Sequence, residues 1–387
     1  MSNPAILRGI TWGHTRGLVP MQATAQRFAE LHPGVEIHWE KRSLKQFEEY
    51  PIERLAESYD LLVIDHPFTG YAAEHGIFLP LDDWLPGDFL ADQARHSVGS
   101  SHVSYTWNRR QWALAIDAAA PVSAWRPDLL LRRGLPAPTT WPEVLALARQ
   151  GGLEIPAAPI YCLMYFYGFC LAAGATPATS ESCIVERSAG EWALATLREL
   201  LALCPTACLA RSPIQSLELL ASAENETLAY CLFPYGYSNY ARDGYAAHPL
   251  VFGEVPTHNP GIPLTTTLGG TGLAISARTV HPRLAADYAA FVASESIQRT
   301  LYTRSGGQPG HRAAWLDEQN NRLTRDFFRQ TLPTHDRAFL RPRHPGYLHA
   351  FQEPAGPVVH RCLRGEIEPR TALQELDRLH THSLSVT

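Results

Sequence analysis

The sequence of 387 residues lacks several features that would assign it to a definite class. No stretch approaches the roughly 18 consecutive apolar residues of a membrane-spanning helix, so we expect no direct insertion into a membrane. Met1 to Arg8 show no basic segment followed by an apolar one, which argues against a secretory signal peptide. We therefore expect a cytoplasmic protein, or a periplasmic one if a leader peptide precedes Met1 in the native protein.

Lysine is almost missing, because Lys41 and Lys45 are the only two and arginine supplies the other positive charges. The formal net charge is −5, so the chain has no overall positive field that would hold nucleic acid or an acidic membrane. The seven cysteines are an odd number, and without a visible signal peptide this favours reduced thiols.

Motifs for metal, cofactor or nucleophile chemistry are absent from the sequence. It contains no HExxH motif, no paired CxxC and no EF-hand loop, and Cys204 and Cys208 have no second pair beside them. It contains neither a GxSxG elbow nor a P-loop. The glycines of Gly269–Gly272 precede a predicted strand, unlike those of a dinucleotide fingerprint. We expect no metal ion and no cofactor.

The apolar pattern that is present predicts an α/β fold, and the length favours two domains. Strand-like segments cover 6–12, 35–39 and 61–64, with helices expected from about residue 19 and over about 44–59. This βαβαβ order requires parallel strands. Later segments predict strands over 112–116, 228–233 and 273–276, and helices over 161–174, 188–203, 282–293, 295–304 and 369–380.

Polar side chains follow each of the three predicted parallel strands. They are His14 and Arg16, then Arg42, then Asp65 and His66. Ligands bind at the carboxyl ends of strands in open parallel sheets, and neighbouring ends meet at one edge. The topology therefore predicts that these side chains lie close together.

Arg16 has two interpretations. A guanidinium near a helix start offers forked donors beside oriented N–H groups, which suits a carboxylate or phosphate. The alternative is an ion pair with Glu30 or Asp65. The same geometry at a strand end suits Arg42 for binding a carboxylate or phosphate. Lys41 is expected to be a solvated surface charge.

Asp65 and His66 have three interpretations. They suit contacts with a ligand, or an acid–base pair near His14, because the pKa of histidine lies close to neutrality. In the third interpretation Asp65 caps the next turn and His66 shapes the loop. A metal site made of these three residues has no supporting ligand spacing.

Several stretches match one family in their order and spacing. They are Phe28–Ile37, Tyr59–Asp65, Phe78–Asp82, Pro138–Val144, and Gly269–Ser276 followed by His281–Phe291, Gln298 and Gly306–Gly310. Together they resemble the bacterial extracellular solute-binding proteins, which include the maltose- and other sugar-binding receptors of ABC transporters. The resemblance covers nearly the whole chain.

The resemblance implies a two-lobed periplasmic-binding-protein fold, with discontinuous domains, a ligand cleft between the lobes and closure by hinge bending. The expected lobes are 1–114 with 268–306, and 115–267 with 307–387. The implied partners are a small-molecule ligand and an ABC-transporter permease.

The two-lobed fold implied by the resemblance makes further residues candidate ligand contacts. Tyr235 and Tyr237 end a predicted second-lobe strand, where they either contact the ligand or form a packing corner. Asp117 faces either the cleft or the hinge, and Trp12 faces either the ligand or the core. Gly270, with the neighbouring Thr271, offers backbone N–H groups to an anion.

The expected function is therefore that of a solute-binding protein for a small polar, anionic ligand, such as a carboxylate, a sugar acid or a phosphorylated compound. The reason is the basic set His14, Arg16, Arg42 and His66, which is unusual for a neutral sugar. The alternative is a cytoplasmic enzyme on the same fold that uses His14, Asp65 and His66 for acid–base chemistry. Whether the protein turns over a substrate stays open.

Overall fold

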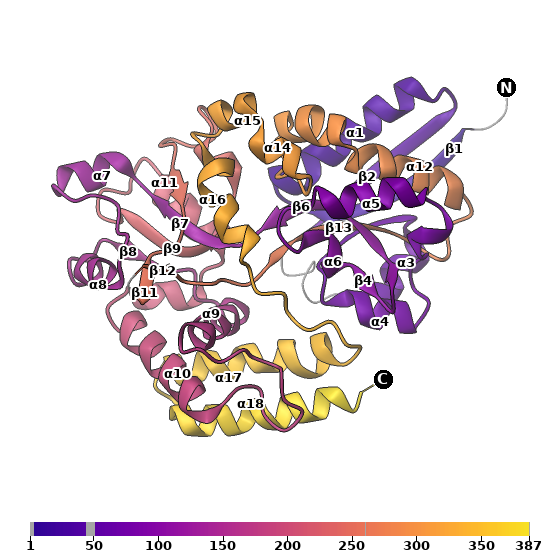
Figure 1. The fold of residues 1–387 in the computed structure, drawn as a ribbon. Helices are drawn as coiled ribbons and strands as arrows, with labels where there is room; N and C mark the ends of the chain where they lie inside the picture. The colour runs from indigo at the N-terminus through magenta and orange to yellow at the C-terminus, as the bar shows by residue number, and fades with distance from the viewer. Residues whose placement is uncertain (1–3, 44–50, 260, 387) are drawn as a thin grey trace. The chain divides into compact units, whose positions relative to one another are not determined.

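The structure is a computed structural model that describes residues 4–43, 51–259 and 261–386 (Figure 1). The chain divides into two compact units, each assembled from separate segments. Unit 1 consists of Met1–Ala119, Gly269–Arg322 and Arg343–Pro345, and unit 2 consists of Ala120–Leu268, Leu323–Pro342 and Gly346–Thr387. No helix within the described residues has both the length and the apolar character needed to cross a membrane.

Unit 1 is built on a mixed sheet whose order, within the described residues, is β2-β1-β3-β13-β6. The strands are β1 (Ala5–Trp12), β2 (Val35–Arg42), β3 (Leu61–Ile64), β6 (Ala113–Ala119) and β13 (Gly269–Ile275). β1 pairs in parallel with β2 and β3, whereas β13 runs antiparallel to β3 and β6. The predicted parallel start of the chain is confirmed, and all four residues of β3 are buried.

The core of unit 1 lies between this sheet and two long helices, α1 (Thr15–Leu31) and α12 (Pro282–Ala293). Phe28 of α1 and Tyr288 of α12 meet edge to face, with ring centroids 5.3 Å apart, and both join the buried cluster that contains Leu61. The apolar faces of the helices thus cover a strand that is apolar on both faces.

The remaining elements of unit 1 are short. They are α3 (Ile52–Ser58), α4 (Phe68–Glu74), η1 (Leu81–Asp83), α5 (Gly87–Arg95), α6 (Ser101–Ser104), β4 (Thr106–Trp107), β5 (Arg110–Gln111), α13 (Glu295–Ile297), the π-helical turn η4 (Gln298–Tyr302), α14 (Arg312–Leu316) and α15 (Glu318–Leu323). The helix predicted over about 44–59 is described only in part, because residues 44–50 lie outside the described residues.

The prediction that the first helix starts near Val19 was wrong, since α1 begins at Thr15. His14 is its N-cap, and its Nδ1 atom accepts a hydrogen bond from the backbone N–H of Arg16 at 3.0 Å. Pro20 consequently lies inside the helix and not in its first turn. Histidine is not among the usual capping residues, so the sequence carried no clear start signal.

The boundaries expected from the sequence, after 114 and 306, differ from those of the units. The structure keeps 115–119 and 307–322 in unit 1. The segment after residue 306 pairs with β6, because Ala118 donates its N–H to the Gln308 carbonyl and Gly310 donates to the Ile116 carbonyl. A pairing between segments so far apart in sequence has no local signal.

Unit 2 contains a second sheet with the order β10-β7-β9-β8 in its described residues. Its elements are β7 (Pro121–Trp125), α7 (Pro127–Arg132), α8 (Trp141–Arg149), β8 (Leu153–Glu154), α9 (Pro159–Ala172), α10 (Arg187–Leu201), η2 (Thr206–Ala210), α11 (Pro213–Ala221), β9 (Tyr230–Tyr235), η3 (Ser238–Ala241), β10 (Val251–Gly253), β11 (Thr257–Asn259), β12 (Ile262–Pro263), α16 (Phe327–Asp336), the π-helical η5 (Tyr347–Gln352), α17 (Glu353–Leu363) and α18 (Pro369–Leu384).

Helix α9 is the centre of the unit 2 core. Every residue from Tyr161 to Cys170 is buried, so the helix is enclosed on all sides. Helices α10 and α17 pack against it (Figure 1). Its tyrosines Tyr161, Tyr165 and Tyr167 all belong to one large buried cluster.

Candidate functional site

The candidate site of unit 1 is the sheet edge where β1, β2 and β3 end. Trp12 pairs with Arg42 across β1 and β2. Strand β13 begins at this edge, because Gly272 pairs with Ile64, and β6 ends there, because Thr271 pairs with Asp117. The topology therefore brings the strand-end residues of this unit to one edge, as the parallel arrangement predicted.

Trp12 belongs to the core at this edge. It is buried and packs within the cluster that contains Leu7 and Phe28. A side chain at Gly17 would overlap the indole, since an added Cβ atom would lie 2.4 Å from Trp12 Cδ2. Of the two interpretations offered by the sequence, the structure favours packing for this residue.

His14 is neutral at physiological pH. Its Nδ1 atom caps α1 by accepting the Arg16 N–H. Burial, aided by the positive charge of Arg16, lowers the pKa of His14 to about 3. A group with this pKa contributes no positive charge at pH 7, and it is too weak a base for efficient general-base catalysis at that pH.

Arg16 pairs with Asp117, and both side chains are almost fully buried. The Arg16 Nε–H group donates to Asp117 Oδ2 at 2.8 Å, and Nη2 donates to Oδ1 in the same forked arrangement. Burial raises the pKa of Asp117, and the Arg16 guanidinium opposes that shift. The partner expected from the sequence was Glu30 or Asp65, so the ion pair was foreseen but its acid was not.

Two further side chains surround this ion pair, and neither was identified from the sequence. Tyr302 is buried, and the charges of Asp117 and Arg16 both act on its hydroxyl group. Gln308 donates its side-chain N–H to the carbonyl of Ala118 at 2.7 Å. The resemblance to the family covered the loop Gly306–Gly310 but supplied no role for Gln308.

Arg42 ends β2 as a buried side chain. Burial lowers its pKa to about 10, and the nearby Tyr59 hydroxyl opposes that shift. Arg42 therefore keeps its positive charge at neutral pH. It is the basic group from the sequence set that gives most support to an anionic ligand.

Asp65 and His66 form a local turn after β3. The Asp65 carboxylate accepts the backbone N–H of His66 at 2.8 Å and lies 3.2 Å from its Nδ1 atom. The His66 carbonyl accepts the N–H of Thr69, which opens α4. His66 is fully buried with its ring edge against Tyr105, whereas the Asp65 side chain is 28% exposed. Asp65 is thus the more accessible of the two to a ligand.

Gly270 and Thr271 lie where β13 pairs in antiparallel fashion with β6. Gly270 has φ +94°, and an added Cβ atom would lie 2.4 Å from the Asp117 carbonyl oxygen. The register shifts between Thr271 and Gly272, as at a β-bulge. Glycine is required here by the close approach of two backbones, and Thr271 is buried.

In unit 2, Tyr235 and Tyr237 follow the end of β9. The Tyr235 hydroxyl group and Thr267 Oγ1 are 2.9 Å apart, and Tyr235 remains partly exposed. Tyr237 is buried and packs edge to face against Tyr240. Tyr235 is therefore the better candidate for ligand contact, and Tyr237 fits the packing-corner interpretation.

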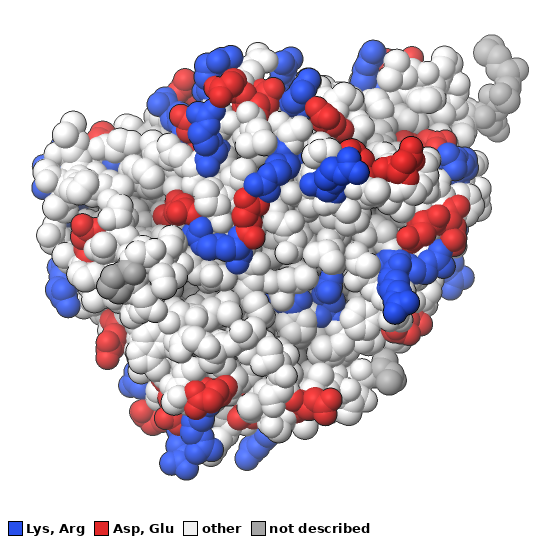
Figure 2. Space-filling view, in the orientation of Figure 1, with Lys and Arg blue, Asp and Glu red and all other residues white. Residues whose placement is uncertain are grey.

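Charges on the visible surface are mixed. Figure 2 shows Lys and Arg interspersed with Asp and Glu over the face in view, with no continuous positive area. The strand-end edge of unit 1 also lacks a strong positive charge, since Arg16 is neutralised by Asp117 and His14 is uncharged. The arrangement can donate and accept hydrogen bonds, but its net positive charge is much smaller than the sequence implied.

Unit 1 also brings together Asp92, His96 and His311, a potential metal-binding group that the sequence analysis missed. The spacing of Asp92 and His96 by four residues on a helix was a usable signal for two ligands. His311 joins them only through the fold.

Residues 12–181 match the model of a family described as bacterial extracellular solute-binding protein. A comparison with curated protein sequences gives no match.

Solved structures share the fold over nearly the whole chain. An ABC transporter solute-binding protein from Agrobacterium radiobacter K84, in complex with ribitol, is 19% identical with a TM-score of 0.80, covering 99% of this chain and 100% of that one. Maltose-bound MalE3 from T. maritima is 18% identical with a TM-score of 0.82, covering 98% and 99%. A solute-binding protein from Agrobacterium vitis S4 with bound D-mannitol is 15% identical with a TM-score of 0.75, covering 98% of each chain.

At these identities the structural likeness shows the fold alone, and it confirms the predicted class of α/β periplasmic-binding-protein folds with discontinuous domains. The chain therefore has the fold of these solved solute-binding proteins, and its residues 12–181 are similar to the bacterial extracellular solute-binding protein family.

Proposed function

We propose that this protein is the solute-recognising component of an ABC transporter and that its ligand is a neutral polyhydroxy compound, a sugar or a sugar alcohol. The observation that carries the proposal is the forked ion pair between Arg16 and Asp117. The Arg16–Asp117 pair as a whole carries no net charge, so this arginine attracts an anion much less than an unpaired guanidinium would.

The other basic groups at the strand ends support the same ligand class. His14 is uncharged at pH 7, because its pKa lies at about 3. Arg42 is charged, but Asp65 lies at the same edge with a partly exposed carboxylate. A carboxylate beside a guanidinium suits hydroxyl groups, which donate to the first and accept from the second.

The solved structures with this fold add independent support. The proteins from Agrobacterium radiobacter K84 and Agrobacterium vitis S4 were solved with ribitol and D-mannitol, and MalE3 with maltose. All three ligands are uncharged polyhydroxy compounds. Low identity leaves the ligand of this chain open, so its class rests on the charge balance described above.

The test is calorimetric titration of the full chain, after extensive dialysis, with ribitol, D-mannitol and maltose and with gluconate and galacturonate. We expect saturable binding of at least one neutral compound and weaker or no binding of the acids. Binding of the acids with no response to the neutral compounds would overturn the proposal and restore the anionic ligand, with Arg42 as its partner.

A matched pair of variants locates the contact. Asp65→Asn removes the charge of the partly exposed carboxylate, and a charged hydrogen bond to a ligand hydroxyl contributes about 1.5–3 kcal/mol. We expect an affinity loss of about tenfold or more. Asp88→Asn, on an exposed residue of α5, is the control and should leave affinity unchanged. Equal behaviour of both variants would remove Asp65 from the site.

The resemblance of residues 12–181 to the solute-binding family also supports a compartment and a partner. We propose that the protein works outside the cytoplasm with a transporter permease, instead of the cytoplasmic location expected from the first residues. Fractionation of cells that express the native gene tests the location, and co-purification with a membrane protein in the presence of ligand tests the partner. Recovery only from the cytoplasm would contradict the location.

A further inference from the structure

Asp92, His96 and His311 form a compact group in unit 1, and none of them is among the strand-end residues described above. Their potential ligand atoms all lie within 4.8 Å of one another. Asp92 and His96 are one helical turn apart at the end of α5, and His311 immediately precedes α14. His96 Nδ1 lies 2.9 Å from one oxygen of Asp92, and His311 Nε2 lies 3.8 Å from the other.

The backbone holds the two histidines opposite each other. Ser97 and His311 form an antiparallel bridge, and Arg312 donates its N–H to the His96 carbonyl at 2.6 Å. The two imidazole rings stack with centroids 5.2 Å apart. Their juxtaposition therefore results from main-chain pairing, and it does not depend on flexible side chains.

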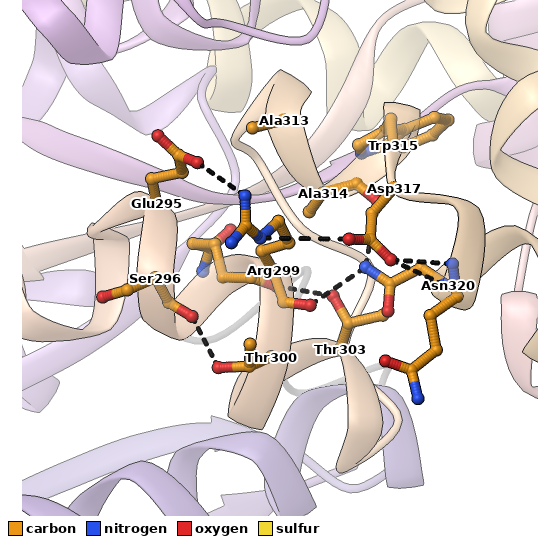
Figure 3. A network of polar contacts seen from close by, with 12 residues as sticks. Glu295, Ser296, Arg299, Thr300, Thr303, Ala313, Ala314, Trp315, Asp317 and Asn320 are labelled. Atoms are coloured by element: carbon orange, nitrogen blue, oxygen red, sulfur yellow. Dashed lines mark hydrogen bonds and ion pairs between the residues drawn. The ribbon is translucent and has the colours of Figure 1, made fainter.

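The segment that carries His311 is fixed by a second set of contacts. Asn320 donates its side-chain N–H groups to the carbonyls of Arg299 and Ala314, each at 3.0 Å. Figure 3 shows this network, in which Arg299 reaches Glu295 on one side and Asp317 on the other. Helix α14 and the preceding His311 thus sit on a preorganised support.

His311 supplies the observation that points to a ligand. Its side chain is 1% exposed, and within residues 4–43, 51–259 and 261–386 its Nε2 atom has no hydrogen-bond partner. Its Nδ1 atom accepts the N–H of Ala313 at 3.3 Å. A buried polar atom without a partner is rare and requires an explanation. This nitrogen faces the carboxylate of Asp92, on the side where His96 also lies.

We propose that Asp92, His96 and His311 bind a divalent transition-metal ion, with Zn²⁺ as the representative. Two imidazole nitrogens and one carboxylate form a ligand set used for zinc, and three protein ligands leave a coordination position for water. Mg²⁺ and Ca²⁺ prefer oxygen ligands, so they fit this set poorly. Asp92 and His96 are partly exposed, which gives the ion a path from solvent.

Protonation at His311 is compatible with this role. Burial and the neighbouring His96 lower the pKa of His311, so the ring is neutral, as a metal ligand must be. Binding through Nε2 places the proton on Nδ1 and gives up the long contact with the Ala313 N–H. The cost of binding is thus the His311 side-chain cap of α14, and the gain is a partner for the buried nitrogen.

An ion at this position links α5 to the start of α14 and so stiffens one part of unit 1. Its role is structural or regulatory, because none of its three ligands belongs to the strand-end residues. The proposal is independent of the solute class, so either can fail without the other.

The test uses the full chain, freed of metal with a chelator and then dialysed, and titrates it with Zn²⁺ in a calorimeter. We expect one equivalent of Zn²⁺ to bind and no comparable binding of Mg²⁺. Asp92→Asn and His311→Ala should each weaken Zn²⁺ binding by about tenfold or more. Added Zn²⁺ should raise the melting temperature of the wild type, because it binds only the folded state.

The control variant is His349→Ala, because the chain offers a similar pair elsewhere. His349 and Glu353 are also four residues apart on a helix, 3.1 Å from each other and about as exposed as His96 and Asp92. Within the described residues this pair is not part of a three-ligand group. We expect His349→Ala to leave Zn²⁺ binding unchanged.

Three results would overturn the proposal: no stoichiometric Zn²⁺ binding, binding unaffected by Asp92→Asn, or an equal loss in the His349→Ala control. Loss of the His311 cap of α14 can destabilise the fold, so His311→Ala is interpreted beside Asp92→Asn, which changes a partly exposed side chain. Crystals soaked with Zn²⁺ should give an anomalous difference peak between the three side chains.

Discussion

Each of the two units has a buried carboxylate in a strand of its own sheet, paired with an arginine. The surroundings of the two ion pairs differ. In unit 1, Asp117 and Arg16 are both excluded from solvent. In unit 2, Glu154 of β8 is buried, but its partner Arg211 is 25% exposed and Ser216 donates a further hydrogen bond. Solvent and the Ser216 hydroxyl thus also stabilise the carboxylate in unit 2, whereas both members of the pair in unit 1 are excluded from solvent.

This difference explains why the strand-end edge of unit 1 carries little net positive charge. A closed ion pair leaves little net charge at a position where the sequence alone predicts an anion site. In unit 2 the corresponding pair lies in the interior of the unit, away from the Tyr235 end of β9. The pair in unit 1 is therefore relevant to ligand choice as well as to stability, and the pair in unit 2 to stability alone.

The largest expected effect comes from breaking the two ion pairs one partner at a time. Arg16→Met leaves Asp117 buried and unpaired, which we expect to lower the free energy of unfolding by about 3–5 kcal/mol. Arg211→Met should cost about 2 kcal/mol, because Ser216 still bonds Glu154 and water can approach. Urea unfolding followed by tryptophan fluorescence measures both.

The double variant Arg16→Met/Asp117→Leu is the control for this comparison. It removes both charges, and we expect it to regain most of the stability lost in Arg16→Met. Equal losses in Arg16→Met and Arg211→Met would show that the two pairs are energetically alike.

A second comparison uses one glycine from each unit. Gly270 of unit 1 has φ +94° and no room for a Cβ atom beside the Asp117 carbonyl, so Gly270→Ala should cost about 3 kcal/mol. Gly244 of unit 2 has φ +77° with no atom within 4 Å, so Gly244→Ala should cost about 1 kcal/mol. Thermal unfolding of both variants tests the order, and a milder effect at Gly270 would contradict the close approach.

The pH dependence of stability offers a third comparison. The folded pKa of His14 is about 3, below the unfolded value near 6.5. The unfolded chain therefore binds the proton first as the pH falls, and stability is lost progressively from about pH 6.5 downward. Because His14 is only partly buried by its surface area, we expect a loss of about 1–2 kcal/mol between pH 7 and pH 5.

His14→Asn isolates this contribution, because asparagine keeps the N-cap of α1 but does not titrate. Unfolding by urea at pH 7 and pH 5 should show a smaller difference in the variant than in the wild type. An unchanged difference would mean that other groups, such as His102, dominate the titration.

The smallest expected effect compares the last residue of β9, Tyr235, with its first, Tyr230. Tyr235→Phe removes a hydroxyl group that pairs with Thr267, and Tyr230→Phe removes one that donates to Ser123. Each should cost about 1 kcal/mol of stability. If Tyr235 contacts the ligand, calorimetry should show weaker solute binding only in Tyr235→Phe. Weaker binding in both variants would indicate an indirect effect.

Much of the fold could be predicted because its signals are local. The run Leu61–Ile64 is apolar on both faces and became a buried central strand, and 282–293 became α12 with the predicted bounds. The start of α1 was missed, because histidine at position 14 is an uncommon cap. The unit boundary after residue 306 was missed because Gly310 pairs with Ile116, far away in the sequence.

The candidate site was predicted in location more successfully than in charge. Parallel topology placed the ends of β1, β2 and β3 at one edge, and this follows from connectivity alone. The partner of Arg16 is Asp117, from a strand about one hundred residues later, and no spacing rule links the two. The grouping of His311 with Asp92 and His96 was likewise invisible in the sequence.

By itself, the sequence of this protein determined the α/β class, the parallel start of the first sheet and the resemblance to solute-binding proteins. These depend on the periodicity of apolar residues and on the order of short segments, which are properties of neighbours in the chain. Only the tertiary structure decided the charge of the strand-end edge, the burial of His66 and the grouping of Asp92 with two histidines. Charge and burial depend on which distant side chains pack together, and that is a property of the folded chain.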